Sequence, residues 1–436
     1  MVLRRLLIRF IFFLQKDPRL KYLKFLEKSS ALSYEELRET QFREILKLLR
    51  YCYQHVPFYK YWLDLHSVNI ADIKNLDDFS KRVPVLTKQD IIEHYTLFAP
   101  PKKMKYVNQS TGGSTGQTLR FRMSKKDHQL GVALLLRGMK LGGYKLGDRI
   151  LVLAGGSLVN KSSKFKLNLL PRLLNQYKIS SYGLEEQDFK TITELVLRKN
   201  IQYLRGYASA LYYLAEYCEK HSVEVSFNAV FSTAERLLDQ QRILIEKVFK
   251  CKVYNQYALN DGGVSAFEHN GETGLVVDME RACLEVAGND AGEEGIILAT
   301  SLYNYAFPFI RYDTGDRGRL QIRKLNSGIK RPVITELLGR QTEFLLVNGR
   351  KIGGPVLTVL MGKTNAEQYR IIQKKEKVIE VQIKKGKLYS KKDEDFIQQS
   401  FKDNCGEDIS IYFTYLESFP NTNKHKFIVS ELPQQG

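Results

Sequence analysis

Glycines and hydroxyl side chains alternate over Ser110–Thr118, in the order Ser-Thr-Gly-Gly-Ser-Thr-Gly-Gln-Thr. Glycine lets the backbone turn so that several N–H groups converge on one anion, and the hydroxyls add further donors. The segment therefore predicts a loop that cradles a polyphosphate such as that of ATP. It is not a Walker loop, because no Gly-Lys-Ser/Thr follows at the required spacing. A plain Ser/Gly surface loop is the alternative that the composition leaves open.

Two other readings of the same residues are disfavoured. Gly112–Gly116 matches the Gly-x-Ser-x-Gly elbow of serine hydrolases, but that elbow needs a strand before it and a helix after it. Here the preceding residues are polar and the following run, Leu119–Met123, has the pattern of a strand. The chain also lacks Gly-x-Gly-x-x-Gly after a strand, which argues against a dinucleotide-dependent oxidoreductase.

Three further segments follow the loop in a fixed order. They are Ala234-Glu235-Arg236 with Val253–Asp261, then Arg311–Asp316, then Gly339–Phe344. Together with the loop, this ordered set resembles the adenylate-forming superfamily. Within it, the likeness is to phenylacetate–CoA ligase and the CapK-like proteins of capsular polysaccharide biosynthesis, and it covers most of the chain.

The resemblance implies a role for each of these residues in binding ATP and magnesium. Ala234, Glu235 and Tyr257 would line the adenine pocket, and Asp316 would accept hydrogen bonds from the ribose hydroxyls. Asp261 stands where the family has a glutamate that helps to hold Mg²⁺, so the carboxylate is kept but its reach is one methylene shorter. The ATP phosphates would be held by Ser110, Thr111, Gly112, Gly113, Ser114, Thr115 and Gly116.

The resemblance also points to the residues that would act in catalysis. Arg340 would lie close to the nucleotide, and Lys424 matches the lysine of the family's C-terminal Gly-Lys pattern, with Asn423 in place of glycine. Lys426 is the competing candidate. The loop departs from the family at Gln117, where a lysine often stands, so one cation near the phosphates is missing.

The apolar pattern predicts a layered α/β fold. Ile150–Ala154 reads as a buried strand that runs into a glycine turn, and helical patterns alternate with short apolar runs such as Ala229–Thr233. The resemblance implies a large N-terminal adenylating domain over residues 1–340 and a hinge at 341–345. A small mobile α+β domain over 346–436 would carry the catalytic lysine. Its expected elements are a hairpin of Tyr369–Ile372 with Val378–Ile383, a helix over Lys392–Phe401 and a strand over Ile409–Tyr415.

Two helical patterns occupy the N-terminal region. Over residues 1–16, leucines and Phe10 share one helical face while Arg5 and Arg9 lie largely off it. An interfacial helix on anionic lipid and a first helix packed on the protein's own core both fit this pattern. The apolar run is too short to span a bilayer, which needs roughly 20 apolar residues. A second helix is predicted over Tyr34–Val56, ending before Pro57.

Charge and cysteine content narrow the class of protein. The 436 residues include 67 Lys and Arg and 48 Asp and Glu. The resulting formal net charge of +19 favours an anionic partner. A nucleotide, a membrane surface, nucleic acid and an acidic polysaccharide all meet that description. The five cysteines are odd in number and never spaced Cys-x-x-Cys. They indicate a reduced, cytoplasmic protein, and we expect no structural zinc.

The expected function is an ATP-dependent, AMP-forming ligase. It would activate a carboxylate as acyl-AMP with release of pyrophosphate, use Mg²⁺, and pass the acyl group to an amine, hydroxyl or thiol acceptor. The CapK-like resemblance favours bacterial surface polysaccharide biosynthesis, for example amide formation on a uronic acid, at the inner face of the membrane. An aryl- or acyl-CoA ligase, with CoA as the acceptor, is one alternative. A non-catalytic nucleotide-binding partner in a membrane assembly is another, and no specific nucleic acid is expected.

Overall fold

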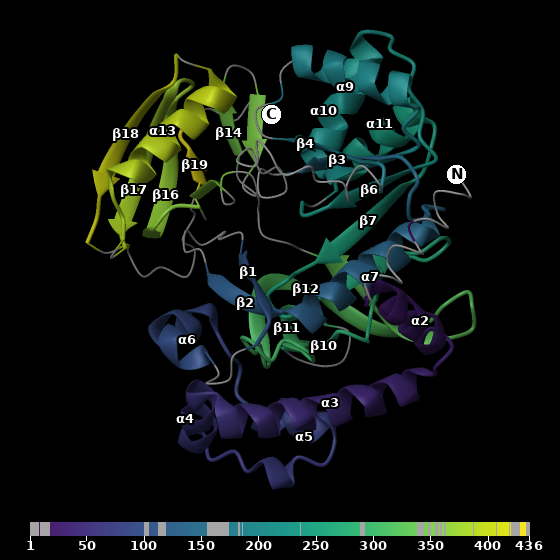
Figure 1. Ribbon diagram of the computed structural model, residues 1–436, viewed down its shortest axis with the longest axis vertical. Coiled ribbons are helices and arrows are strands. Elements are labelled where there is room, and N and C mark those ends of the chain that lie inside the picture. The colour runs from purple at the N-terminus through teal and green to yellow at the C-terminus, as the bar shows by residue number, and fades with distance from the viewer. Residues whose placement is uncertain are drawn as a thin grey trace. The chain divides into compact units, whose positions relative to one another are not determined.

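The computed structural model of the protein divides into two compact units (Figure 1). Unit 1 comprises residues 1–109, 121–148 and 254–340, and unit 2 comprises residues 110–120, 149–253 and 341–436. The structure describes residues 8, 18–99, 104–111, 119–154, 174–181, 184, 186–235, 237–287, 293–337, 344–347, 350–353, 357, 360–361, 363–386, 388–406, 408–417, 419 and 428–432.

Unit 1 is built on an antiparallel sheet with the strand order β10-β11-β12-β13-β9-β8-β7. Its inner positions are filled by apolar side chains, among them Val264, Ala266, Ile297 and Ala299. The strands are β7 (Val253–Ala258), β8 (Ser265–Glu268), β9 (Leu275–Val277), β10 (Ala282–Ala287), β11 (Gly295–Ser301), β12 (Tyr312–Lys324) and β13 (Lys330–Leu337).

Helices complete unit 1. Helix α7 approaches the sheet closely at Gly138, where an added Cβ would lie 2.3 Å from the ring of Phe267, so a side chain there would force the two apart. The predicted helix over Tyr34–Val56 is confirmed as α3, and Pro57 opens the next helix because its fixed φ suits a first turn. The helical segments are α2 (Arg19–Ser29), α3 (Tyr34–His55), α4 (Pro57–Leu65), η1 (Ile70–Asp72), α5 (Leu76–Arg82), α6 (Lys88–Glu93), η2 (Tyr95–Phe98) and α7 (Lys125–Leu141).

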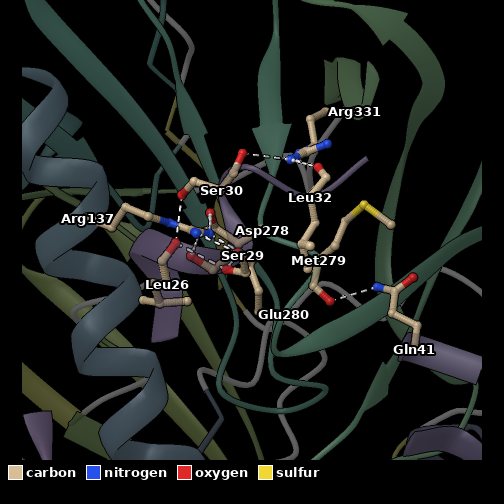
Figure 2. Close-up of polar contacts among 11 residues, drawn as sticks. Leu26, Ser29, Ser30, Leu32, Gln41, Arg137, Asp278, Met279, Glu280 and Arg331 are labelled. Atoms are coloured by element: carbon tan, nitrogen blue, oxygen red, sulfur yellow. Dashed lines mark hydrogen bonds and ion pairs between the residues drawn. The ribbon is translucent and has the colours of Figure 1, made fainter. Parts of the chain in front are cut away.

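A buried polar cluster fastens α2 and α7 to this sheet (Figure 2). The guanidinium of Arg137 donates to Glu280 at 2.5 and 2.8 Å and to Asp278 at 2.5 Å. Ser29, at the end of α2, donates to the same Glu280 carboxylate at 2.6 Å, and Ser265 donates to Asp278 at 2.6 Å. Charged groups are kept inside the unit here because each meets an opposite charge or a hydroxyl.

The turn between α2 and α3 is fixed by a second set of bonds. Arg331 donates to the backbone carbonyls of Ser30, at 3.2 Å, and Leu32, at 2.8 Å. Gln41 of α3 donates to the carbonyl of Met279 at 2.9 Å, as Figure 2 shows. Side chains far apart in sequence therefore hold backbone carbonyls of this turn and of the segment after β9.

Unit 2 contains a parallel sheet with the strand order β6-β5-β3-β4, and helices α9, α10 and α11 gather on one side of it in Figure 1. The predicted strands at Ile150–Ala154 and Ala229–Thr233 are confirmed as β3 and β6. The other elements are β4 (Gln176–Ser180), α9 (Glu186–Lys199), β5 (Tyr203–Tyr207), α10 (Ala208–Lys220) and α11 (Asp239–Phe249).

The C-terminal part of the chain forms an α+β layer, as the sequence predicts. Strands β16 and β17 make the expected hairpin, and the four-stranded sheet has the order β18-β17-β16-β19. Its elements are β16 (Ala366–Lys375), β17 (Val378–Lys385), α13 (Lys391–Cys405), β18 (Ser410–Tyr415) and β19 (Ile428–Ser430). Two small sheets pair β1 (Tyr106–Ser110) with β2 (Arg120–Ser124) and β14 (Phe344–Val347) with β15 (Arg350–Gly353).

The α/β class is confirmed, whereas two expectations of organisation stay predictions. The hinge at residues 341–345 and the boundary after residue 340 lie mostly outside the described residues. The same holds for the N-terminal helix, of which only Ile8 is described; its side chain is buried.

Candidate nucleotide-binding site

The two ends of the predicted phosphate loop are held together. The N–H of Thr111 donates to the carbonyl of Leu119 at 2.8 Å, and the N–H of Leu119 donates to the Thr111 hydroxyl oxygen at 3.1 Å. Ser110 is exposed at the end of β1, and Thr111 is half-buried. The residues between, Gly112–Thr118, lie outside the described part of the chain. The loop is thus closed at its base by Thr111, whose side chain has a structural role besides the predicted one.

Tyr257 and Asp316, which lie 59 residues apart in sequence, meet in unit 1. The Tyr257 hydroxyl donates to Asp316 Oδ2 at 2.9 Å. Both side chains are buried, and the Tyr257 ring packs against the apolar cluster that contains Val264 and Ala299. The structure therefore brings together the two side chains that the sequence assigned to the adenine pocket and the ribose.

The backbone that carries Asp316 is fixed by its own side chains. Gly315 has a φ of +75°, and its N–H donates to Asp313 at 2.7 Å. The Thr314 hydroxyl donates to the carbonyl of Ile297 at 2.7 Å and accepts the N–H of Asp316 at 3.2 Å. These bonds set the position of the Asp316 carboxylate before any ligand binds.

Arg311, for which the sequence suggested no separate role, anchors the start of this segment. Its backbone has a φ of +47°, a conformation that non-glycine residues rarely adopt. Its N–H donates to the hydroxyl of Thr300 at 2.9 Å, and its guanidinium pairs with Glu285 at 3.1 Å and also donates to the carbonyl of Val83. A strained backbone held from several sides is typical of a functional site. The arginine in the Arg-Tyr-Asp-Thr-Gly-Asp string was the sequence signal for it.

Asp261 lies in a tight glycine turn after β7. The turn is closed by a bond from the N–H of Leu259 to the carbonyl of Val264 at 3.1 Å. Gly262 has a φ of +94°, and a Cβ there would lie 2.7 Å from Cβ of Ala299. Since only glycine fits, the half-buried Asp261 is presented at a defined place.

The position and chemistry of the Asp261 carboxylate fit a magnesium ion. Mg²⁺ keeps several of its waters and binds through one or two carboxylates together with the phosphates of a substrate. No group of three or more His, Cys, Asp or Glu side chains that could hold a metal ion occurs among the described residues. Asp261 would thus share the ion with the nucleotide.

Ala234 and Glu235 follow β6 in unit 2. Ala234 has a φ of +67°, and Glu235 accepts the N–H of Ser209, in the first turn of α10, at 2.8 Å. Burial raises the pKa of Glu235, and the bonds from Ser209 oppose that rise. The predicted adenine residue Glu235 therefore also caps helix α10, a contact the sequence did not predict.

The remaining predicted site residues cannot be placed against this geometry. Arg340, Lys424 and its competitor Lys426 lie outside the described residues. Their roles stay predictions, as do those of Gly112–Gly116.

Known proteins similar to this chain include a CapK protein and phenylacetate–coenzyme A ligases, the two kinds of protein that the sequence resembles. CapK of Staphylococcus aureus is 28% identical over 322 residues, which are 71% of this chain and 68% of that protein. A phenylacetate–coenzyme A ligase of Thermus thermophilus is 25% identical over 340 residues, 73% of this chain and 74% of that ligase. No family model matches the chain. The chain belongs with the adenylate-forming ligases.

Solved structures agree with this placement at the level of the fold. A 2-hydroxyisobutyryl-CoA ligase, in complex with 2-HIB-AMP and CoA, superimposes with a TM-score of 0.62 at 16% identity. The match covers 92% of this ligase and 90% of the other. Across the described ranges of the ligase, no helix is long and apolar enough to cross a membrane.

Proposed function

We propose that this ligase uses ATP to convert a carboxylate into an acyl-adenylate and then transfers the acyl group to an acceptor in bacterial surface polysaccharide biosynthesis. The observation that carries the proposal is the hydrogen bond of Tyr257 to Asp316. It joins two segments that the resemblance assigns independently to one nucleotide. Residues of those types, buried together at the ends of distant strands, suit the recognition of a nucleoside.

The reaction gives the carboxylate a good leaving group, AMP. A carboxylate oxygen attacks the α-phosphorus of ATP, and the bond from that phosphorus to the bridging oxygen breaks, so that pyrophosphate leaves with the electron pair. An amine, hydroxyl or thiol then attacks the acyl carbon and expels AMP, while the acceptor proton passes to solvent. The protein needs no nucleophile of its own; it must align the reactants and stabilise the charge on the phosphates.

The chain's own residues divide these tasks. The Ser110–Gly116 loop would supply N–H and hydroxyl donors to the phosphates, and Asp316 would accept the ribose hydroxyls. Asp261 would hold Mg²⁺, which when bound neutralises phosphate charge. Lys424 would provide a mobile cation at the α-phosphate, and Arg340 would lie near the nucleotide. Ala234 and Glu235 would line the adenine.

The proposed pathway and location have separate support. A protein named CapK is among the relatives, and the net charge of +19 favours an anionic substrate or surface. We place the enzyme in the reduced cytoplasm because its cysteines are scattered and unpaired in sequence. A position at the inner face of the membrane is proposed from the basic, amphipathic pattern of residues 1–16.

The decisive test is magnesium-dependent release of pyrophosphate from ATP, with hydroxylamine as the trap for acyl-adenylate. The acid panel contains aryl acids, fatty acids, amino acids and sugar-nucleotide uronic acids. We expect release with one class, and Lys424→Ala should lower the rate at least about 100-fold, or ~2.7 kcal/mol, while ATP binding is retained. The matched control is Lys426→Ala, which should keep most of the activity.

Near-normal adenylation by Lys424→Ala would reject that lysine. Silence with every acid, in protein that still binds ATP, would favour the non-catalytic nucleotide-binding partner instead.

A CoA ligase is the second candidate, because the relatives include phenylacetate–coenzyme A ligases. The two candidates share the first half-reaction and differ in the acceptor. Adding coenzyme A to the adenylating enzyme and analysing the product by mass spectrometry separates them. A thioester formed as fast as the adenylate would select the CoA ligase.

A further inference from the structure

Helix α2 of unit 1 presents three lysines and a phenylalanine on one side. Lys21, Lys24, Phe25 and Lys28 are all exposed, and Phe25 leaves 40% of its surface open to solvent. Residues at positions i, i+3, i+4 and i+7 lie on the same side of a helix, so these four side chains form one surface. At a rise of 1.5 Å per residue this surface, the lysine face, is about 10 Å long.

The opposite side of α2 holds the helix to unit 1. The Leu26 side chain is buried, and the Ser29 hydroxyl donates to the buried carboxylate of Glu280 at 2.6 Å, as Figure 2 shows. The helix also packs along α7. Because these contacts fix the other side of α2, the lysine face points away from the unit and its four side chains are presented together.

The lysine face carries charge of one sign. Within the described part of the chain, none of its three lysines forms an ion pair. Glu27 is the one acid of α2, and it lies about 120° around the helix from Lys21. Like charges three or four residues apart destabilise a helix, so solvated helices usually mix both signs. Helix α3 does so, and its Lys47 pairs with Glu44 at 2.6 Å. The uniform charge of the lysine face therefore suits an anionic partner.

A fourth cation extends this positive surface onto the start of α7. The Lys126 ammonium lies 3.9 Å from the centre of the Tyr303 ring. Partial burial lowers the pKa of Lys126, Glu44 opposes that change, and the charges of Lys47 and Lys21 lower the pKa further. Lys126 is thus close enough to Lys21 to feel its charge. Clusters of about four to eight Lys or Arg residues on an amphipathic helix are typical of binding to anionic lipid.

We propose that the lysine face docks the ligase on an anionic lipid bilayer. The three ammonium groups would contact headgroup phosphates, and the Phe25 ring would enter the boundary between headgroups and acyl chains. A bilayer suits this face better than a nucleic acid does, because an exposed ring among lysines gains from the apolar layer beneath the phosphates. The inference rests on the proposed position of the enzyme at the membrane and assigns that position to a surface separate from residues 1–16.

The experiment measures co-sedimentation of the full chain with lipid vesicles. One set contains phosphatidylglycerol and phosphatidylcholine in equal parts, and the other contains phosphatidylcholine alone. We expect binding to the anionic set. It should weaken at least about tenfold when the ionic strength rises from about 0.1 M to about 1 M, because the screening length falls from about 10 Å to about 3 Å. Failure of the wild type to bind anionic vesicles, or equal binding to both sets, overturns the proposal.

The main variant is the triple substitution Lys21→Gln/Lys24→Gln/Lys28→Gln. Each lysine near an anionic surface strengthens binding about fivefold, so the triple variant should bind anionic vesicles at least about 30-fold more weakly. The three positions are exposed and glutamine is a good helix former, so the fold should be kept, and the urea midpoint checks this. Phe25→Ser should lose about threefold to tenfold and keep the salt dependence of the wild type.

The matched control removes the same charge from another helix. Lys190→Gln/Arg198→Gln/Lys199→Gln takes three exposed cations from α9, which also carries acidic residues, and should bind vesicles as the wild type does. Equal losses in the two triple variants would assign binding to net charge alone and overturn the proposal. Wild-type binding by the lysine-face variant, or a defect of that variant only in binding duplex DNA, would overturn it as well.

Failure of the proposed function is read separately. Pyrophosphate release with soluble acids, without vesicles, reports adenylation, and the lysine-face variant should keep the wild-type rate there. Vesicle binding that depends on the lysine face, in protein that adenylates no acid, would reject the proposed reaction and leave the docking surface. Adenylation with wild-type vesicle binding by the lysine-face variant would reject the docking surface and leave the reaction.

Discussion

Two arginines, Arg137 in unit 1 and Arg205 in unit 2, stand in opposite electrostatic settings. Arg137 contacts two carboxylates, those of Asp278 and Glu280, at 2.5 Å each. Burial alone would lower the pKa of Arg137, but the two carboxylates raise it well above its ordinary value. Arg205 lies in a sheet whose strands contain no acid, and burial lowers its pKa.

The difference separates an arginine that two carboxylates join to the fold from an arginine on four strands that contain no acidic residue. The partners of Arg137 are built into the chain and join α2, α7 and the sheet. The four strands around Arg205, β3 to β6, contain no acidic residue. The pairing of Arg137 with two carboxylates therefore marks it as the arginine on which the fold depends more.

The largest effect expected from this comparison is on stability. Arg137→Met leaves two carboxylates buried without their cation and should lower the free energy of unfolding by about 3–5 kcal/mol. Arg205→Met removes a half-buried charge and should change it by less than about 1 kcal/mol. Urea denaturation midpoints at neutral pH, with the slope of the transition compared, measure both. Equal losses in the two variants would break the comparison.

The elements of the fold were largely predictable, because their signals are local. The apolar runs of β3 and β6 and the period of α3 predicted these elements nearly to the residue. The polar contacts were not predictable in the same way. The pair of Arg137 and Glu280 spans 143 residues, and no local pattern specifies which distant carboxylate an arginine meets.

The contacts of the candidate site were likewise not predictable from the sequence alone. Resemblance nominated Tyr257 and Asp316, but their hydrogen bond depends on where β7 and β12 lie in the sheet. The anchoring of Arg311 by Glu285 and the capping of α10 by Glu235 likewise follow from tertiary structure. The residue types in the sequence predicted the chemistry of the site. Which side chains contact one another depends on the fold.

A smaller effect, on the affinity for ATP, tests whether the hydrogen bond of Tyr257 to Asp316 contributes to nucleotide binding. Tyr257→Phe keeps the ring and removes the donor to Asp316, so affinity for ATP should fall about tenfold, or ~1.4 kcal/mol. If Asp316 binds the ribose hydroxyls, the loss should nearly vanish with 2′,3′-dideoxy-ATP. Tyr254→Phe is the matched control, since it removes a hydroxyl on the same strand that donates to Asn270 at 2.9 Å. A penalty of the same size for both nucleotides would assign the hydroxyl to packing alone.

The smallest effect concerns Glu235, the carboxylate that contacts the helix following the strand of Arg205. Its raised pKa means that the folded protein holds the proton more tightly than the unfolded chain does. This contribution to stability is complete below the ordinary glutamate pKa and is lost as the pH rises through the folded pKa. Glu235→Gln stays neutral and still accepts the Ser209 N–H. Relative to wild type, it should therefore gain stability with rising pH, by less than about 1 kcal/mol.

Urea denaturation of wild type and Glu235→Gln at intervals between pH 4 and pH 7 measures how the difference in their stability changes with pH. The control for losing one carboxylate is Glu224→Gln, at an exposed position of the same unit. The sign of this pH dependence decides whether the two arginines stand in different electrostatic settings. If Glu235 paired with Arg205, its folded pKa would be depressed, and wild type would lose stability relative to Glu235→Gln as the pH falls. That opposite slope would make Glu235 a carboxylate partner of Arg205, as Asp278 and Glu280 are of Arg137.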